Sequence, residues 1–121
     1  QGRSKNSRKI WILDWKTAPT YGWHARKRRD FLVQAQIALY KKFWRVKNDY
    51  DCPDVGPGFV LLKRGAKKNP VDLFKVSVGP KMEEKAEKLL RSMLKTVRTG
   101  IYIKNRNSCK YCPYFNTEHC T

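Results

Sequence analysis

The chain has 121 residues, with 27 Lys and Arg against 10 Asp and Glu, and its formal net charge is +17. This length allows one modest core, so we expect a single domain over residues 1–121. The charge favours a polyanionic partner, nucleic acid before an anionic membrane surface, and no apolar stretch is long enough to cross a membrane. Four cysteines without a secretory signal favour a reducing compartment, where metal binding is commoner than disulfide formation.

The first predicted element is a strand over residues 9–15, which follows a polar, basic segment, residues 1–8, that we expect to be flexible. The apolar run ends in Asp14, Trp15 and Lys16. Because side chains alternate along a strand, Asp14 and Lys16 point to the same face. Burying a charge is costly unless it is paired or binds a metal, so this pair suits metal-assisted phosphodiester hydrolysis. The carboxylate would hold a divalent cation, and the ammonium would position the attacking water.

Residues 17–28 are predicted to form a connection that runs into four consecutive cations. These cations are Arg26, Lys27, Arg28 and Arg29. Four cations at the start of a helix oppose the helix dipole, which favours a phosphate-binding role over a purely structural one. Trp23 and His24 precede the cations and are predicted to stack on bases.

A helix is predicted from Asp30 to Val46, because apolar residues recur there at steps of three and four, with Asp30 as its cap or first-turn acid. Gln36 and Tyr40 lie four residues apart and therefore share a face of this helix. An amide and a hydroxyl on one face can bind a phosphate or orient a metal-bound water. Residues 48–58 contain two prolines and two glycines, which predicts a loop.

Two further apolar runs, residues 59–64 and 71–78, are predicted to be the strands of a hairpin. A second helix is predicted over residues 81–98, ended by Gly100. Its apolar face consists of Met82, Ala86, Leu89, Leu90, Met93 and Val97. The order of strands and helices predicts an α/β fold.

The tail, residues 101–121, carries Cys109, Cys112 and Cys120. Two thiolates separated by two residues can hold one metal centre, and a short loop can bring in the third. Cys52 and His119 are candidates for the fourth ligand. The spacing is compatible with both zinc and an iron–sulfur cluster.

Taken in order, these motifs resemble the PD-(D/E)xK nuclease superfamily, and within it the RecB-like branch, which includes CRISPR-associated adaptation nucleases and phage exonucleases. The shared features are a strand with Asp14-x-Lys16, a helix with Gln36-x-x-x-Tyr40, a hairpin, a further helix and a terminal cysteine cluster. The resemblance covers residues 9–120, with the nuclease-like core over residues 9–100.

The resemblance implies a restriction-endonuclease-like α/β fold, in which helices flank a mixed sheet. It also implies an Mg²⁺- or Mn²⁺-dependent DNA exonuclease in the cytoplasm of a bacterial or phage-infected cell. Asp14 and the main-chain carbonyl of Trp15 would bind the metal, and Lys16 would position the nucleophilic water. Gln36 and Tyr40 would support the site and contact DNA. The tail cysteines would combine with an upstream cysteine to hold a [4Fe–4S] cluster.

The chain departs from the family pattern near its N-terminus. The family has a second acidic metal ligand on the strand before the Asp-x-Lys motif, and residues 1–13 contain no Asp, Glu or His. We therefore expect either the C-terminal half of such a nuclease, with another chain or segment supplying the acid and the upstream cysteine, or a degenerate relative. One carboxylate binds Mg²⁺ weakly, so we expect no cleavage by this chain in isolation.

Two other interpretations stay open. A non-catalytic nucleic-acid-binding or structural protein with a degenerate nuclease scaffold is favoured by the net charge of +17 and by the missing acid. Its DNA binding would be indifferent to Mg²⁺ and to Asp14→Asn. A small zinc protein, in which the Asp-x-Lys motif is accidental, would bind DNA through its cysteine tail alone.

Overall fold

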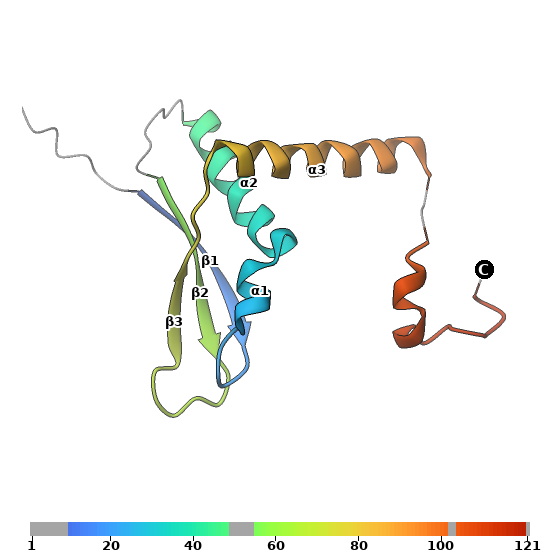
Figure 1. Ribbon diagram of the computed structural model, residues 1–121, viewed down its shortest axis with the longest axis horizontal. Helices are drawn as coiled ribbons and strands as arrows, with labels where there is room; N and C mark the ends of the chain where they lie inside the picture. The colour runs from blue at the N-terminus through green and yellow to red at the C-terminus, as the bar shows by residue number, and fades with distance from the viewer. Residues whose placement is uncertain (1–9, 49–54, 102–103, 121) are drawn as a thin grey trace, which may run out of the picture. The chain divides into compact units, whose positions relative to one another are not determined.

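The computed structural model describes residues 10–48, 55–101 and 104–120. The chain divides into two compact units, Gln1–Leu90 and Arg91–Thr121, which are described one at a time. The prediction of a single domain stays a prediction. The first unit holds the sheet and the helices that lie beside it, coloured from blue to yellow in Figure 1.

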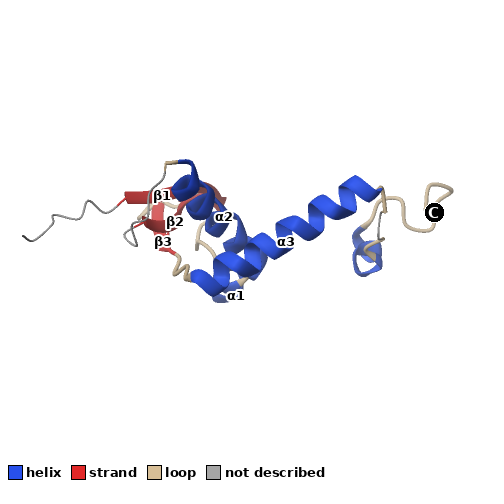
Figure 2. Cartoon of the chain, turned by 90° about the horizontal axis from the view of Figure 1, so that it is seen from above, coloured by secondary structure: helices blue, strands red, loops and turns tan. Residues whose placement is uncertain are grey.

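The sheet has three strands in the order β1-β2-β3. Strand β1 (Ile10–Ala18) runs parallel to the central strand β2 (Val55–Lys63), and β3 (Val71–Lys75) pairs with β2 in the antiparallel direction. The connection from β1 to its parallel neighbour passes through helices, as parallel pairing requires. Figure 2 shows the three strands gathered in one sheet with α2 beside them. The predicted mixed sheet with flanking helices is confirmed.

Strand β1 is longer than predicted and continues through Ala18, so Asp14 and Lys16 lie inside the strand rather than at its end. Pairing with β2 extends it, since every residue from Ile10 to Ala18 has a partner in the register. The buried Ala18 then accepts a hydrogen bond from the backbone N–H of Arg64 at 2.9 Å. The strand therefore ends where the chain meets the β2–β3 turn.

The predicted connection before the long helix contains a short helix, α1 (Ala25–Arg29), which the sequence analysis did not predict. His24 caps it by accepting the backbone N–H of Lys27 at Nδ1, 3.2 Å away. Helix α2 (Phe31–Lys47) agrees with the predicted helix. Its predicted cap is confirmed, because an Asp30 carboxylate oxygen accepts the backbone N–H of Leu32 at 2.8 Å.

The predicted loop over residues 48–58 is wrong at its C-terminal end, because β2 already begins at Val55. Residues 49–54 lie outside the described part of the chain. Gly56 and Gly58 were interpreted as loop residues, but both lie in the strand, where close neighbours need the space. A Cβ at Gly56 would come within 2.8 Å of the Trp11 ring, and one at Gly58 within 3.0 Å of the Phe74 carbonyl oxygen.

The predicted hairpin is confirmed, although its second strand ends at Lys75 rather than at residue 78. Val76 still donates a backbone hydrogen bond to the Pro57 carbonyl at 3.0 Å. Beyond it, Val76 and Val78 are buried and join the core. Burial therefore keeps this segment against the helices after the ladder has ended.

One face of the sheet packs against the helices and forms the core. Ala18, Phe59 and Leu61 on this covered face contact a layer of small and apolar side chains from α2 and from the segment after β3. The helical contribution includes Ala35, Ile37, Ala38 and Ala86. Burying these side chains supplies the main stabilising term for the first unit.

The opposite face of the sheet is not covered by any described element of the first unit, and we call it the open face. Odd-numbered residues of β1 point to it, in strict alternation with the half-buried residues of the covered face. Six of its large apolar side chains are between 37% and 64% exposed, whereas Val60, which also points to this face, is buried. The six are Trp11, Leu13, Trp15, Leu62, Val71 and Leu73.

Helix α3 (Pro80–Thr99) agrees with the prediction, and Gly100 follows it with a φ of 65°, a left-handed conformation that favours glycine. Only part of its predicted apolar face is covered. Ala86 is buried, but Met93 and Val97 are 57% and 67% exposed.

The second unit contains the end of α3 and a 3₁₀ helix, Arg106–Tyr111, followed by a series of tight turns. None of the residues described between 104 and 120 is buried. None of the described helices in the chain is both long and apolar enough to cross a lipid bilayer.

Candidate active site

The structure places Asp14 and Lys16 side by side on the covered face of β1. Nζ of Lys16 lies 2.9 Å from Oδ2 of Asp14, and the two side chains are 33% and 21% exposed, respectively. That oxygen is buried and has no hydrogen-bond partner among the described residues, so the contact is an ion pair without hydrogen-bond geometry. The predicted pairing of these two side chains on one face is thus present.

Asp14 offers a carboxylate oxygen to a cation, but it does not belong to a group of described side chains that could hold one. A buried carboxylate oxygen without a hydrogen bond can accept a cation, because oxygen ligands are what Mg²⁺ and Mn²⁺ prefer. No three His, Cys, Asp or Glu side chains gather to hold a metal ion within the described residues. Asp14 therefore fits as one ligand of a cation, but the described residues do not complete a site around it. The role predicted for the Trp15 carbonyl stays a prediction.

The second predicted pair, Gln36 and Tyr40, is also brought together. Nε2 of Gln36 donates a hydrogen bond to the Tyr40 hydroxyl at 3.1 Å, and Tyr40 is 46% exposed. The pair lies on α2, the helix that packs against β1 and β2. No hydrogen bond or ion pair links it to Asp14 or Lys16 within the part of the chain that the structure describes. The two pairs thus lie on adjacent elements, and their joint action on a substrate stays a prediction.

The four consecutive cations lie in α1. They differ in whether their side chains already contact other groups of the chain. Arg26, Lys27 and Arg29 are exposed. Arg28 is half-buried, with its Nε donating to the Trp23 carbonyl at 2.8 Å and its guanidinium 2.6 Å from the Asp72 carboxylate. Arg28 therefore ties α1 to β3, which leaves the three exposed cations as the better candidates for phosphate contact.

A basic pocket of about 450 Å³ lies between α1, the start of α2 and the end of β3. Arg28, Arg29, Gln34 and Ser77 are among the residues that line it. Lys75 also borders the pocket, but its ammonium lies 5.0 Å from the centroid of the Trp11 ring on the open face. Nε2 of Gln34 donates to the Arg28 carbonyl at 2.6 Å, which fixes the start of α2 against α1. The pocket gathers cations and polar groups of the kind that hold a phosphate.

Trp23 is buried, so its predicted stacking on bases is wrong for the described structure, whereas the stacking predicted for His24 stays a prediction. Trp23 is 6% exposed, and its ring packs 5.3 Å from the Phe59 ring, centroid to centroid, inside the core. The Lys27 ammonium lies 4.6 Å from the centroid of the same ring. His24 is exposed but serves as the cap of α1. Trp23 thus has a core role, which the sequence pattern could not distinguish from a surface role.

The three tail cysteines are not in disulfides, and they line one pocket of about 520 Å³ with His119. The backbone N–H of Cys112 donates to the Cys109 carbonyl at 3.0 Å, which gives the Cys-x-x-Cys segment a tight turn. These thiols do not converge into a coordination site in the described structure. His119 is the candidate fourth ligand that the structure brings to them, whereas Cys52 lies outside the described residues.

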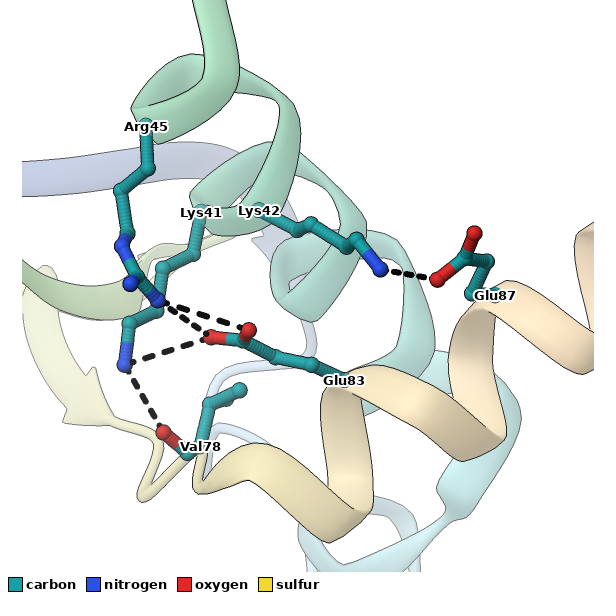
Figure 3. Close-up of polar contacts among 6 residues, drawn as sticks. All are labelled: Lys41, Lys42, Arg45, Val78, Glu83 and Glu87. Atoms are coloured by element: carbon teal, nitrogen blue, oxygen red, sulfur yellow. Dashed lines mark hydrogen bonds and ion pairs between the residues drawn. The ribbon is translucent and has the colours of Figure 1, made fainter. Parts of the chain in front are cut away.

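The sequence analysis missed the polar network that attaches α3 to α2. Lys41 is 8% exposed, and its ammonium donates to the Val78 carbonyl at 2.8 Å and lies 3.6 Å from the Glu83 carboxylate. Arg45 approaches the same carboxylate at 3.4 Å, and Lys42 pairs with Glu87 (Figure 3). Cations at positions 41, 42 and 45 and acids at 83 and 87 were visible as patterns in the sequence, but nothing indicated that they face each other.

Comparison with known proteins identifies the family of the chain. The model of the PD-(D/E)XK nuclease superfamily matches residues 3–117. No curated protein and no solved structure matched the chain. The mixed sheet with flanking helices is consistent with the restriction-endonuclease-like α/β fold, and Asp14-x-Lys16 lies on a strand within it. The chain therefore belongs to the PD-(D/E)XK nuclease superfamily.

Proposed function

We propose that the chain is the core of a metal-dependent DNA nuclease of the RecB-like branch, and that it degrades DNA from an end. The observation that carries this proposal is the Asp14–Lys16 ion pair on β1, in which a buried carboxylate oxygen lacks a hydrogen bond. Membership of the superfamily already indicates a nuclease-type function. The exonuclease mode and the metal requirement are the finer parts of the proposal.

Each residue of the pair has a separate task. Asp14 would hold Mg²⁺ or Mn²⁺, whose chemistry when bound is to activate water and to neutralise phosphate charge. Lys16 would donate hydrogen bonds to the attacking water and stabilise the negative charge that develops on the phosphate. Gln36 and Tyr40 would orient the scissile phosphate from α2, and the exposed cations of α1 would follow the DNA backbone.

The second acidic ligand would come from a partner along the outer edge of β1. No strand pairs with that edge within the described residues. Adjacent strands lie about 4.8 Å apart, so a carboxylate on a strand added there can reach a cation that Asp14 holds. The partner chain or segment that completes the site is therefore part of the proposed enzyme.

The cysteine tail would hold zinc or a [4Fe–4S] cluster. Support comes from the unbridged thiols of Cys109, Cys112 and Cys120 around one pocket, which also favour a reducing compartment such as the cytoplasm. Metal analysis of protein purified without air, together with its visible absorbance, distinguishes the two. If Cys52→Ser loses the bound metal and His119→Ala keeps it, Cys52 is the fourth ligand. A full chain without zinc or iron contradicts this part of the proposal.

The decisive experiment is cleavage of end-labelled linear DNA by the assembled protein, isolated from its source with its partner. We expect Lys16→Ala to lower the rate by about 100-fold in Mg²⁺, as loss of a transition-state stabiliser does. Lys81→Ala is the matched control, because it removes the same charge from an exposed position at the start of α3. Cleavage by Lys16→Ala at the wild-type rate would sink the assignment, and cutting of closed circular DNA would exclude an exonuclease.

A non-catalytic DNA-binding protein is the second candidate, and the net charge of +17 and the single carboxylate favour it. The same preparations test it. This candidate predicts DNA binding that falls with salt, is unaffected by Mg²⁺ and is equal in Asp14→Asn and wild type. Mg²⁺-dependent binding that Asp14→Asn abolishes would exclude it.

A further inference from the structure

Two turns meet at the end of the sheet where β1 and β2 finish. The first turn, residues 19–22, follows β1, and the second, residues 64–70, joins β2 to β3 (Figure 1). The Thr20 hydroxyl donates to the Arg64 carbonyl at 2.8 Å, and the Arg64 N–H donates to the Ala18 carbonyl at 2.9 Å. These bonds hold the turns side by side. We call the two turns, together with Lys63 at the end of β2, the basic corner.

Tyr21 occupies the tip of the first turn, where its side chain is 78% exposed. The Gly22 N–H closes the turn by donating to the Pro19 carbonyl at 2.8 Å, and Gly22 has a φ of 82°, which favours glycine. Within the described residues, Tyr21 has no hydrogen bond, ion pair or ring contact of its side chain. Turns are usually built from small polar residues, glycine and proline. An aromatic ring that contacts nothing in the described chain is therefore available to a ligand.

The basic corner carries positive charge that no acid neutralises. Its cations are Lys63, Arg64, Lys67 and Lys68. None of the four has an ion-pair partner in the part of the chain that the structure describes, and all but Lys63 are exposed. The Lys63 side chain passes the first turn, with its Cδ 3.6 Å from the position of a Cβ at Gly22. The Asp72 carboxylate lies 3.8 Å from the same position, but it is already paired with Arg28 at 2.6 Å.

An exposed ring among unpaired cations suits single-stranded nucleic acid better than a protein. Cations contact the phosphates of a single strand while its unpaired bases stack on aromatic rings. A protein interface needs an apolar centre, and Tyr21 is the one large apolar side chain in residues 19–22 and 63–70. The position of the corner also fits a polymer. Ala18, to which Arg64 is bonded, lies two residues beyond Lys16 on β1, about 7 Å along the strand, so one strand of DNA can reach both.

We propose that the basic corner binds the single-stranded end of a DNA substrate. The Tyr21 ring stacks on an unpaired base, and the Arg64 guanidinium contacts a neighbouring phosphate. Tyr21 thereby determines specificity for unpaired DNA. The inference rests on the proposed function in taking DNA as the substrate, and it adds the form of DNA that enters the site.

The test is equilibrium binding of fluorescein-labelled DNA to the assembled protein, measured by anisotropy without added divalent cations so that the DNA stays intact. A single-stranded oligonucleotide is compared with a blunt duplex of the same length. We expect Tyr21→Ala to weaken binding of the single strand by about tenfold, as loss of one stacked base does, and binding of the duplex by less than about twofold. Tyr21→Phe keeps the ring and should bind as the wild type does. Tyr111→Ala is the matched control, because Tyr111 is 79% exposed in the second unit.

The salt dependence of binding distinguishes the stacking contact from the phosphate contact. Arg64→Gln should lower the slope of log affinity against log salt concentration by about 0.7, the value for one phosphate contact on a single strand. Tyr21→Ala should leave this slope unchanged, because stacking releases no counterions. Lys81→Gln should also leave it unchanged, since it removes an exposed cation at the start of α3, outside the corner.

The proposal is overturned if Tyr21→Ala binds the single strand as tightly as the wild type, or if it weakens binding of the single strand and the duplex equally. An equal loss in Tyr21→Phe or in Tyr111→Ala also overturns it. If Tyr21→Ala spares DNA binding and instead weakens binding to phosphatidylserine vesicles, the corner contacts lipid and the proposal fails. All of these are binding measurements, so they can fail while Lys16→Ala still abolishes cleavage, which keeps this inference and the proposed nuclease function separately testable.

Discussion

The half-buried carboxylate of Glu83 offers the sharpest test of how α3 is held against α2. Lys41 and Arg45 both approach it, at 3.6 and 3.4 Å, and its side chain is 13% exposed (Figure 3). Glu83→Gln keeps the shape of the side chain but leaves the buried Lys41 ammonium with the Val78 carbonyl as its one hydrogen-bond partner among the described residues. Removing one member of a buried ion pair typically costs about 3–5 kcal/mol, because the other charge stays buried. We expect a loss of about 3 kcal/mol, since Arg45 is closer to solvent than Lys41.

Lys41→Met should lower the free energy of unfolding by less than Glu83→Gln does. It removes one charge-assisted hydrogen bond, worth about 1.5–3 kcal/mol, but leaves Glu83 paired with Arg45, so we expect about 2 kcal/mol. The double variant removes both buried charges of the pair. Its decrease in the free energy of unfolding should be smaller than the sum of the decreases in the two single variants, by about 1 kcal/mol or more. Lys42→Met breaks the more exposed pair with Glu87 and should cost about 0.5 kcal/mol.

Urea unfolding followed by tryptophan fluorescence measures these free energies, because Trp23 is buried in the same core. The slope of the transition must match that of the wild type for the comparison to hold. Additive costs for Lys41→Met and Glu83→Gln would refute the coupling between the two side chains. A Glu83→Gln variant as stable as the wild type would refute the buried network itself.

Two further perturbations test the elements that carry the candidate site. Asp30→Ala removes the cap of α2 and should lower the free energy of unfolding by about 1 kcal/mol, with Asp30→Ser restoring most of it; equal melting temperatures for wild type and Asp30→Ala would contradict the cap. Gly58→Ala would bring a methyl group within 3.0 Å of the Phe74 carbonyl oxygen and should cost about 1–3 kcal/mol in urea unfolding; an unchanged urea midpoint would show that β3 moves aside without strain.

Elements with a strong local signal were predicted well from the sequence. The apolar spacing and the Asp30 cap located α2 to within one residue, and the alternating runs located the hairpin. The start of β2 was missed because Gly56, Pro57 and Gly58 carry loop signals. Their place in the strand depends on Trp11, a residue from another strand that lies across Gly56. Such contacts between distant segments leave no trace in local composition.

In the candidate site, too, contacts set by local spacing were predicted, and contacts between distant segments were not. Spacing alone predicted that Asp14 would meet Lys16 and that Gln36 would meet Tyr40, because strand and helix periods place those pairs together. Spacing could not predict that Trp23 would turn inward onto Phe59, or that Arg28 would find Asp72 across 44 residues of chain. Trp23 shortly precedes four cations in the sequence. This pattern is the same whether the ring contacts nucleic acid or lies in the core.

Two features of the first unit are incomplete, the Asp14–Lys16 pair and the outer edge of the sheet, and both belong to β1. The Asp14–Lys16 pair, the predicted catalytic pair, has one carboxylate, and β1 has an outer edge with no partner strand in the described residues. The same strand supplies three of the apolar side chains on the open face. Because side chains alternate along β1, the Asp14–Lys16 pair and the exposed apolar side chains lie on opposite faces of the same strand. A strand that paired with the outer edge of β1 would therefore bring one row of its side chains beside Asp14 and the other row beside the open face.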